Sequence, residues 1–162
     1  MKFIRLTAVL LLGATVLAAG CSKPAPVSTV AAKPPKHEHK PPHGGTPVVL
    51  GDEIYHVELV LDAAAGRLQA FVFDGELENF IRSTAPAIEI NAVVNGQPKT
   101  VVLSAVANPA TGETVGDTAL FDGQADWLKT AKEFDATLKT ITIRGTTFAD
   151  VKFNFPKGND KD

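Results

Sequence analysis

The chain is poor in sulfur, with one cysteine and one methionine among its 162 residues. A single cysteine excludes a disulfide within the chain, so the fold must be stabilised by apolar burial instead. Since the only methionine is the initiator, soft thioether and thiol ligands that favour Cu⁺ are also lacking. Any metal chemistry must therefore rely on nitrogen and oxygen ligands.

Positive charge is scarce as well, since the formal net charge is −2 at pH 7. Residues 46–162 alone carry 17 acidic against 10 basic residues. No basic patch with interleaved aromatics occurs, so we expect no nucleic-acid partner. A glycine-rich phosphate loop, a Ser-His-Asp arrangement and a Gly-x-Ser-x-Gly elbow are all missing. With one histidine among residues 46–162 and no free cysteine expected, the chain is not expected to be an enzyme.

The one long apolar run lies at residues 6–19, behind Lys2 and Arg5. It is too short to span a bilayer comfortably and is typical of a secretory signal, here residues 1–20. The run ends in Ala-Ala-Gly before Cys21, which resembles the bacterial lipobox. We therefore expect Cys21 to be lipidated and to anchor the chain to a membrane. Ordinary cleavage that leaves a free thiol is the alternative. Ser22, rather than an aspartate, slightly favours the outer membrane.

Residues 21–45 are predicted to be a linker rich in proline and histidine. Six of the eleven prolines fall here, and large apolar side chains are nearly absent. Such a segment cannot bury enough surface to offset its chain entropy, so we expect it to be disordered and extended. Its four lysines against one glutamate suit a position near lipid headgroups, although they could equally serve only solubility.

From Thr46 onward the pattern changes to short strands separated by turn residues. Gly51-Asp52 reads as a two-residue hairpin turn, which would pair His56 with Pro47. The alternation after it puts Tyr55, Val57, Leu59 and Leu61 on one face, and His56 with Glu58 on the other. Residues 46–156 are predicted to form an all-β fold, an antiparallel β-sandwich of seven to eight strands with an immunoglobulin-like shape. Residues 157–162 are expected to be a solvated tail.

Three of the four histidines, His37, His39 and His43, lie within seven positions. Imidazole is a common ligand for Zn²⁺ and Cu²⁺, and a bend at Gly44-Gly45 could bring His43 over the face that carries His56 and Glu58. We therefore predict metal ligands at the positions listed here: His43, His56, His37, His39 and Glu58. The histidines could also be incidental to a soluble linker.

Two acidic groups offer weaker alternatives as calcium sites. One is Asp74, Glu76 and Glu78, and the other is Asp117, Asp122 and Asp126. Neither follows the twelve-residue loop pattern of calcium-binding hands, and both suit acidic turns.

The stretch "PHGGTPVVLGDEIYHVELVLD" resembles the opening of a β-domain found at the N-terminus of periplasmic adaptor subunits of RND-type heavy-metal efflux systems. In those adaptors a histidine-rich segment often precedes the motif, as "HEHKPPHGG" does here. The resemblance implies metal capture, with His43 and His56 as the positions that carry over. The coiled-coil and barrel domains of the adaptors have no counterpart in this sequence, so it implies a capture module only.

These observations predict a lipoprotein of the bacterial cell envelope that faces the periplasm and binds Zn²⁺ or Cu²⁺ in metal capture or homeostasis. Its partners would be the membrane, through the anchor, and an envelope protein or efflux component. The alternative is a tethered β-sandwich interaction module without catalysis, in which the histidines play no part.

Overall fold

The computed structural model of this chain describes residues 40–160. The expected signal peptide, Cys21, His37, His39 and most of the expected linker lie outside that range. So do residues 161–162 at the C-terminus.

Eight β-strands and one short 3₁₀ turn make up the described part of the chain, and every strand pair is antiparallel. The prediction of an all-β fold is confirmed. The elements are β1 (Thr46–Leu50), β2 (Tyr55–Asp62), β3 (Arg67–Asp74), β4 (Ala87–Val94), β5 (Gln97–Ala105), β6 (Leu120–Gln124), η1 (Asp126–Lys129), β7 (Phe134–Ile143) and β8 (Thr146–Phe155).

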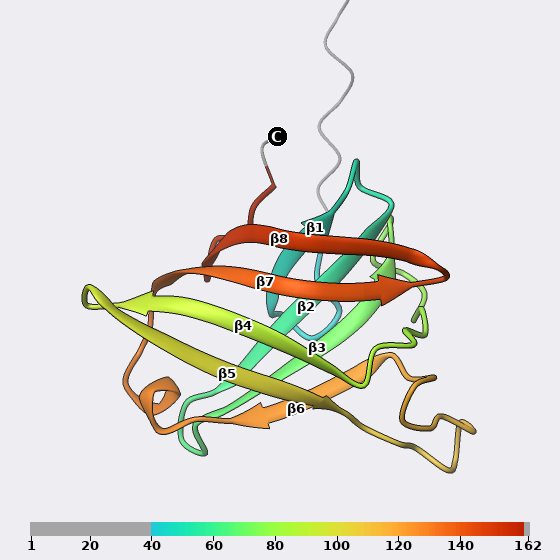
Figure 1. Cartoon of the computed structure of the whole chain (residues 1–162), viewed down its shortest axis with the longest axis horizontal. Coiled ribbons are helices and arrows are strands. Elements are labelled where there is room, and N and C mark those ends of the chain that lie inside the picture. Colours follow the sequence, from blue (N-terminus) through green and yellow to red (C-terminus); the bar gives the residue numbers. More distant parts are fainter. Residues whose placement is uncertain (1–39, 161–162) are drawn as a thin grey trace, which may run out of the picture. The chain divides into compact units, whose positions relative to one another are not determined.

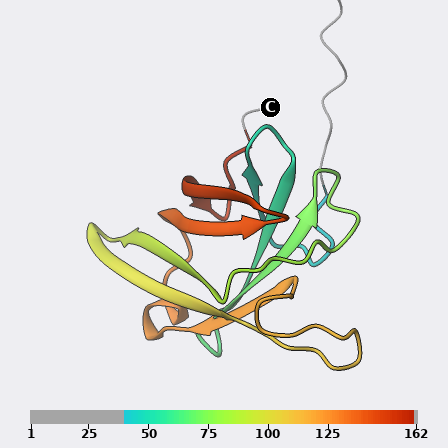
Figure 2. The ribbon, with the colours of Figure 1, turned by 45° about the vertical axis from the view of Figure 1, so that its right-hand side comes forward.

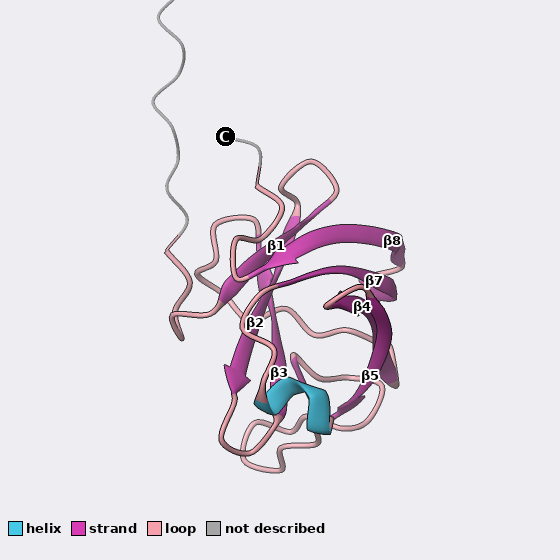
Figure 3. Cartoon of the chain, turned by 90° about the vertical axis from the view of Figure 1, so that its left-hand side faces the viewer, coloured by secondary structure: helices cyan, strands magenta, loops and turns pink. Residues whose placement is uncertain are grey.

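The strands form one sheet in the order β1-β2-β3-β6-β5-β4-β7-β8. This sheet curls so that β4, β5, β7 and β8 lie across β1, β2 and β3 (Figure 1). The same two walls are seen from other directions in Figure 2 and Figure 3. The fold therefore belongs to the sandwich and barrel class, with two walls that come from one continuous, nearly closed sheet.

The core fills the space between the two walls and follows the alternation of the strands. On β2, Val57 and Leu59 are fully buried and point into this core, as the sequence predicts. On β3, Leu68, Ala70 and Val72 do the same. The opposite face of β2 and β3 is the outer face, and it carries the candidate site.

The hairpin between β1 and β2 differs from the expected one. Its turn spans four residues, 51–54, because Glu53 as well as Gly51 adopts a positive φ. As a result His56 pairs with Val49, and Glu58 takes the place opposite Pro47. The predicted pairing of His56 with Pro47 is therefore wrong by two residues. A shift of two leaves every side chain on its expected face, since the side-chain period of a strand is two.

The seam between the first and last strands is closed by residues that follow β8. The side-chain amide of Asn159 accepts a hydrogen bond from Val49 N at 2.7 Å and donates one to Val49 O at 3.1 Å. Gly158 is buried against the carbonyl of Pro47. Residues 158 and 159 are thus part of the fold, which corrects the expectation of a solvated tail beginning at residue 157. An unpaired edge would leave these backbone groups without partners.

Replacement of Gly158 by alanine tests this closure. A Cβ at Gly158 would lie 2.2 Å from Pro47 O, whereas a Cβ at Gly96 would meet nothing within 4 Å. Both glycines have positive φ, so the same backbone strain applies to each. We expect Gly96→Ala to cost about 1 kcal/mol and Gly158→Ala about 3 kcal/mol or more in the free energy of unfolding. Denaturant titration measures both, and equal losses would contradict the proposed closure.

Candidate functional site

The candidate site lies on the outer face of β2 and β3, where the chain first joins the sheet. We call residues 40–45 the approach segment. It turns back on itself through a hydrogen bond from Gly44 N to Pro41 O. This turn carries His43 across β2, as the two glycines in the sequence indicate.

Gly45 allows the approach segment to lie directly on β2. A Cβ at this position would lie 2.5 Å from Leu59 O and 2.9 Å from the Glu58 side chain. Any other residue would push the segment away from the strand. The glycine therefore serves a close approach of two backbones rather than chain flexibility.

The carboxylate of Glu58 is fully buried and holds the approach segment by three contacts. Its Oε1 accepts hydrogen bonds from His43 N and from Gly45 N, both at 2.8 Å. Its Oε2 lies 2.7 Å from Nδ1 of the His43 ring. A buried carboxylate is costly unless donors surround it, and here His43 N, the His43 ring and Gly45 N all come from one short stretch of chain.

The contact with Glu58 decides which nitrogen of His43 carries the proton. Since both carboxylate oxygens act as acceptors, Nδ1 carries the ring hydrogen and donates it to Oε2. The lone pair of the neutral ring is then on Nε2. The ring stacks on Phe71 with centroids 4.0 Å apart, and the side chain remains 36 % exposed. His43 is thus held in one orientation and one tautomer while it remains accessible.

His56 lies on the same outer face, as predicted, but it is not on an open polar surface. It is 0 % exposed, and its Nδ1 lies 3.3 Å from the carbonyl oxygen of Asp74. The neighbouring position on β3 is Phe73, which is itself buried and stacks with Phe80. The expectation of an accessible His56 is therefore wrong, because aromatic side chains and the approach segment cover this face.

Within residues 40–160, no three or more histidine, cysteine, aspartate or glutamate side chains form a group that could hold a metal ion. His43 and Glu58 are together, but the other predicted ligands are either buried or, like His37 and His39, outside the described range.

Both acidic groups considered for calcium have structural partners. Burial alone would raise the pKa of the Asp74 carboxyl, but hydrogen bonds from the Asn79 side chain and from the N–H groups of Glu78 and Asn79 lower this pKa below its ordinary value. The second group is dispersed over three ion pairs, Asp117 with Arg82, Asp122 with Arg67 and Asp126 with Lys129.

The sequence interpretation missed the aromatic cluster around His43. Phe71 and Phe73 point outward from β3, and Phe80 packs on them from the following loop. The alternating "AFVFD" stretch was the available signal, because its two phenylalanines fall on the face opposite the core.

Comparison with protein-family models, with curated proteins and with solved structures finds no match. Among the residues that the structure covers, no helix is both long and apolar enough to cross a membrane.

Loss of the Glu58 carboxylate should release the approach segment. Glu58→Ala leaves His43 N, Gly45 N and the His43 ring without their acceptor, and we expect a loss of about 2 kcal/mol in the free energy of unfolding. Glu76→Ala on an exposed turn is the matched control and should change stability by less than about 0.5 kcal/mol. Chemical denaturation measures both. An unaffected Glu58→Ala protein would mean that these hydrogen bonds do not hold the segment.

Proposed function

We propose that this chain is a membrane-anchored lipoprotein of the bacterial cell envelope that binds Zn²⁺ or Cu²⁺ in metal capture or homeostasis. His43 is the ligand on the folded domain, and His37 and His39 supply further imidazoles from the linker. The proposal includes no catalytic step. The observation that carries it is the contact between His43 Nδ1 and the buried Glu58 carboxylate.

This contact supports metal binding because it leaves the correct nitrogen available. Histidines that bind metals usually donate their other ring N–H to a carboxylate or carbonyl, which fixes the tautomer and raises the basicity of the ligand nitrogen. Glu58 provides such an acceptor at 2.7 Å from Nδ1. In this proposal Glu58 is a positioning residue rather than a ligand, since its oxygens already accept three hydrogen bonds. Buried His56 takes no part.

The linker histidines suit the remaining positions of a four-coordinate ion. His39 and His37 precede His43 by four and six residues, with Pro41 and Pro42 between them. The prolines reduce the entropy that the chain loses when the three rings converge. Because a neutral imidazole is needed at each position, nitrogen-preferring Zn²⁺ and Cu²⁺ suit the set better than oxygen-preferring Ca²⁺ or Mg²⁺.

The sharpest test replaces Glu58 by its amide. In Glu58→Gln the side-chain oxygen can still accept from His43 N and Gly45 N, so the amide NH₂ must face Nδ1. Nδ1 must then accept, and the ring proton moves to Nε2, where it blocks metal binding. We expect calorimetric titration to show Zn²⁺ affinity about 10- to 100-fold lower, with stability largely retained.

His43→Ala shows the Zn²⁺ affinity that remains without the ligand on the folded domain. Glu76→Gln is the matched control for the change from carboxylate to amide. The proposal fails if Glu58→Gln binds Zn²⁺ as tightly as the unmodified protein. It also fails if the whole protein binds no more tightly than a peptide of residues 33–45.

The lipid anchor has a separate test. Cys21→Ser should abolish incorporation of labelled palmitate and move the protein from the membrane fraction to the soluble periplasmic fraction, because acyl chains supply the membrane affinity. Fractionation with and without the substitution measures this. Membrane association that persists in Cys21→Ser would contradict the proposed lipidation.

A further inference from the structure

A pocket of about 390 Å³ lies beside the candidate site and is not used by it. Its apolar lining consists of the rings of Phe71 and Phe80 together with Ala119 and Leu120. The volume is at the lower end of the range for small-ligand sites, which usually combine apolar walls with a few polar groups. This pocket has both, so it can hold one small molecule.

The two aromatic rings of the pocket are held in place by stacking. Phe71 stacks on the His43 ring with centroids 4.0 Å apart, and Phe80 stacks on Phe73 with centroids 4.6 Å apart. Phe71 and Phe80 are tilted by 45° to each other, with centroids 6.3 Å apart. Phe80 nevertheless remains 57 % exposed. Two fixed and tilted rings favour a third aromatic ring, because it can take an offset or edge-to-face position against each of them.

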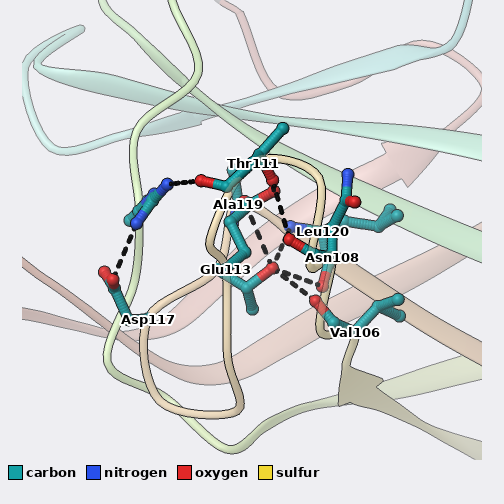
Figure 4. A network of polar contacts seen from close by, with 9 residues as sticks. Val106, Asn108, Thr111, Glu113, Asp117, Ala119 and Leu120 are labelled. Atoms are coloured by element: carbon teal, nitrogen blue, oxygen red, sulfur yellow. Dashed lines mark hydrogen bonds and ion pairs between the residues drawn. The ribbon is translucent and has the colours of Figure 1, made fainter.

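The two charged side chains of the lining have opposite signs, and both are already paired within the protein. Arg82 donates to the Asp117 carboxylate at 2.8 Å and to the Thr111 carbonyl at 2.6 Å. Figure 4 shows Glu113, which accepts hydrogen bonds from Ala119 N and from the Thr111 hydroxyl. Burial raises the pKa of the Glu113 carboxyl, but these hydrogen bonds and the nearby Arg82 charge bring it below its ordinary value, so Glu113 is ionised at neutral pH. A charged ligand would lose its water without gaining an unpaired counter-charge, and a neutral ligand avoids this cost.

Asn108 supplies a polar group that is still available to a ligand. It lines the pocket, and its side-chain Oδ1 accepts a hydrogen bond from Ala110 N at 3.1 Å. Its carbonyl accepts another from Glu113 N at 3.0 Å. Within residues 40–160 the side-chain nitrogen Nδ2 of Asn108 donates to no partner. Because these bonds brace the loop of residues 106–119, the pocket and its amide donor exist before any ligand arrives.

We infer that this pocket binds a small neutral molecule that carries an aromatic ring and a hydrogen-bond acceptor, such as an aryl amide or an aryl ketone. The ring lies against Phe71 and Phe80, and the acceptor receives a hydrogen bond from Asn108 Nδ2. This binding goes beyond the proposed function, because it requires neither a metal ion nor the linker histidines.

An NMR titration in metal-free buffer tests the inference with one-ring probes. The full chain carries Cys21→Ser, and its backbone amide shifts are followed as benzamide, benzoate, benzylamine or cyclohexanecarboxamide is added. We expect benzamide to shift the amides of Thr111, Ala119 and Leu120 with a Kd of about 1–10 mM, as suits so small a ligand. Benzoate and benzylamine keep the ring but carry a charge, and cyclohexanecarboxamide keeps the amide but is not aromatic. Each of these three should bind at least about fivefold more weakly than benzamide.

Three variants locate the binding. Phe80→Ala should abolish the benzamide shifts. Val93→Ala should retain them, because Val93 is a comparably exposed apolar residue that does not line this pocket. Asn108→Asp keeps the acceptor for Ala110 N but removes the Nδ2 donor, so it should raise the Kd of benzamide about fivefold.

The inference is overturned if benzamide shifts none of the three pocket amides, or if the shifts survive Phe80→Ala. It is also overturned if a charged probe or cyclohexanecarboxamide binds as tightly as benzamide. Because no metal is present, failure here leaves the Zn²⁺ titration of Glu58→Gln unaffected, and the reverse also holds.

Discussion

The arrangement of the outer face depends on one buried carboxylate. Glu58 lies beneath the approach segment with no exposed surface, and its oxygens accept hydrogen bonds from His43 N, the His43 ring and Gly45 N. A carboxylate in this position needs donors, and the segment needs an acceptor for its backbone. The approach segment supplies the donors for the carboxylate, and the carboxylate is the acceptor for the segment. The same contact orients the accessible imidazole of His43. The hydrogen bonds to Glu58 therefore both stabilise the approach segment and determine which nitrogen of His43 is available.

Strand periodicity was enough to predict the face of the site but not its arrangement. His56 and Glu58 are two residues apart, so they share a face in any register. Which of them lies under His43 depends on the length of the β1–β2 turn. A two-residue turn would place His56 there, whereas the four-residue turn places Glu58. The positive φ of Glu53, a non-glycine residue, lengthens the turn, and sequence patterns predict such a conformation poorly.

Local sequence patterns could not predict that the outer face is buried either, because segments from elsewhere in the chain pack on it. His56 is fully buried and pairs with Phe73 on β3, which in turn stacks with Phe80 from the loop after that strand. Asn159 closes the seam from 110 residues away. By contrast, the strand Arg67–Asp74 carries local signals in the sequence, because its apolar residues alternate and Gly66 and Gly75 flank it.

The central claim is that Glu58 fixes the tautomer of His43, and nitrogen NMR of the imidazole ring measures this directly. In metal-free protein, at a pH where the imidazole is neutral, long-range proton–nitrogen spectra should show His43 with a protonated Nδ1 and an unprotonated Nε2. A ring protonated mainly at Nε2, or one that averages between the two forms as free imidazole does, would contradict the account.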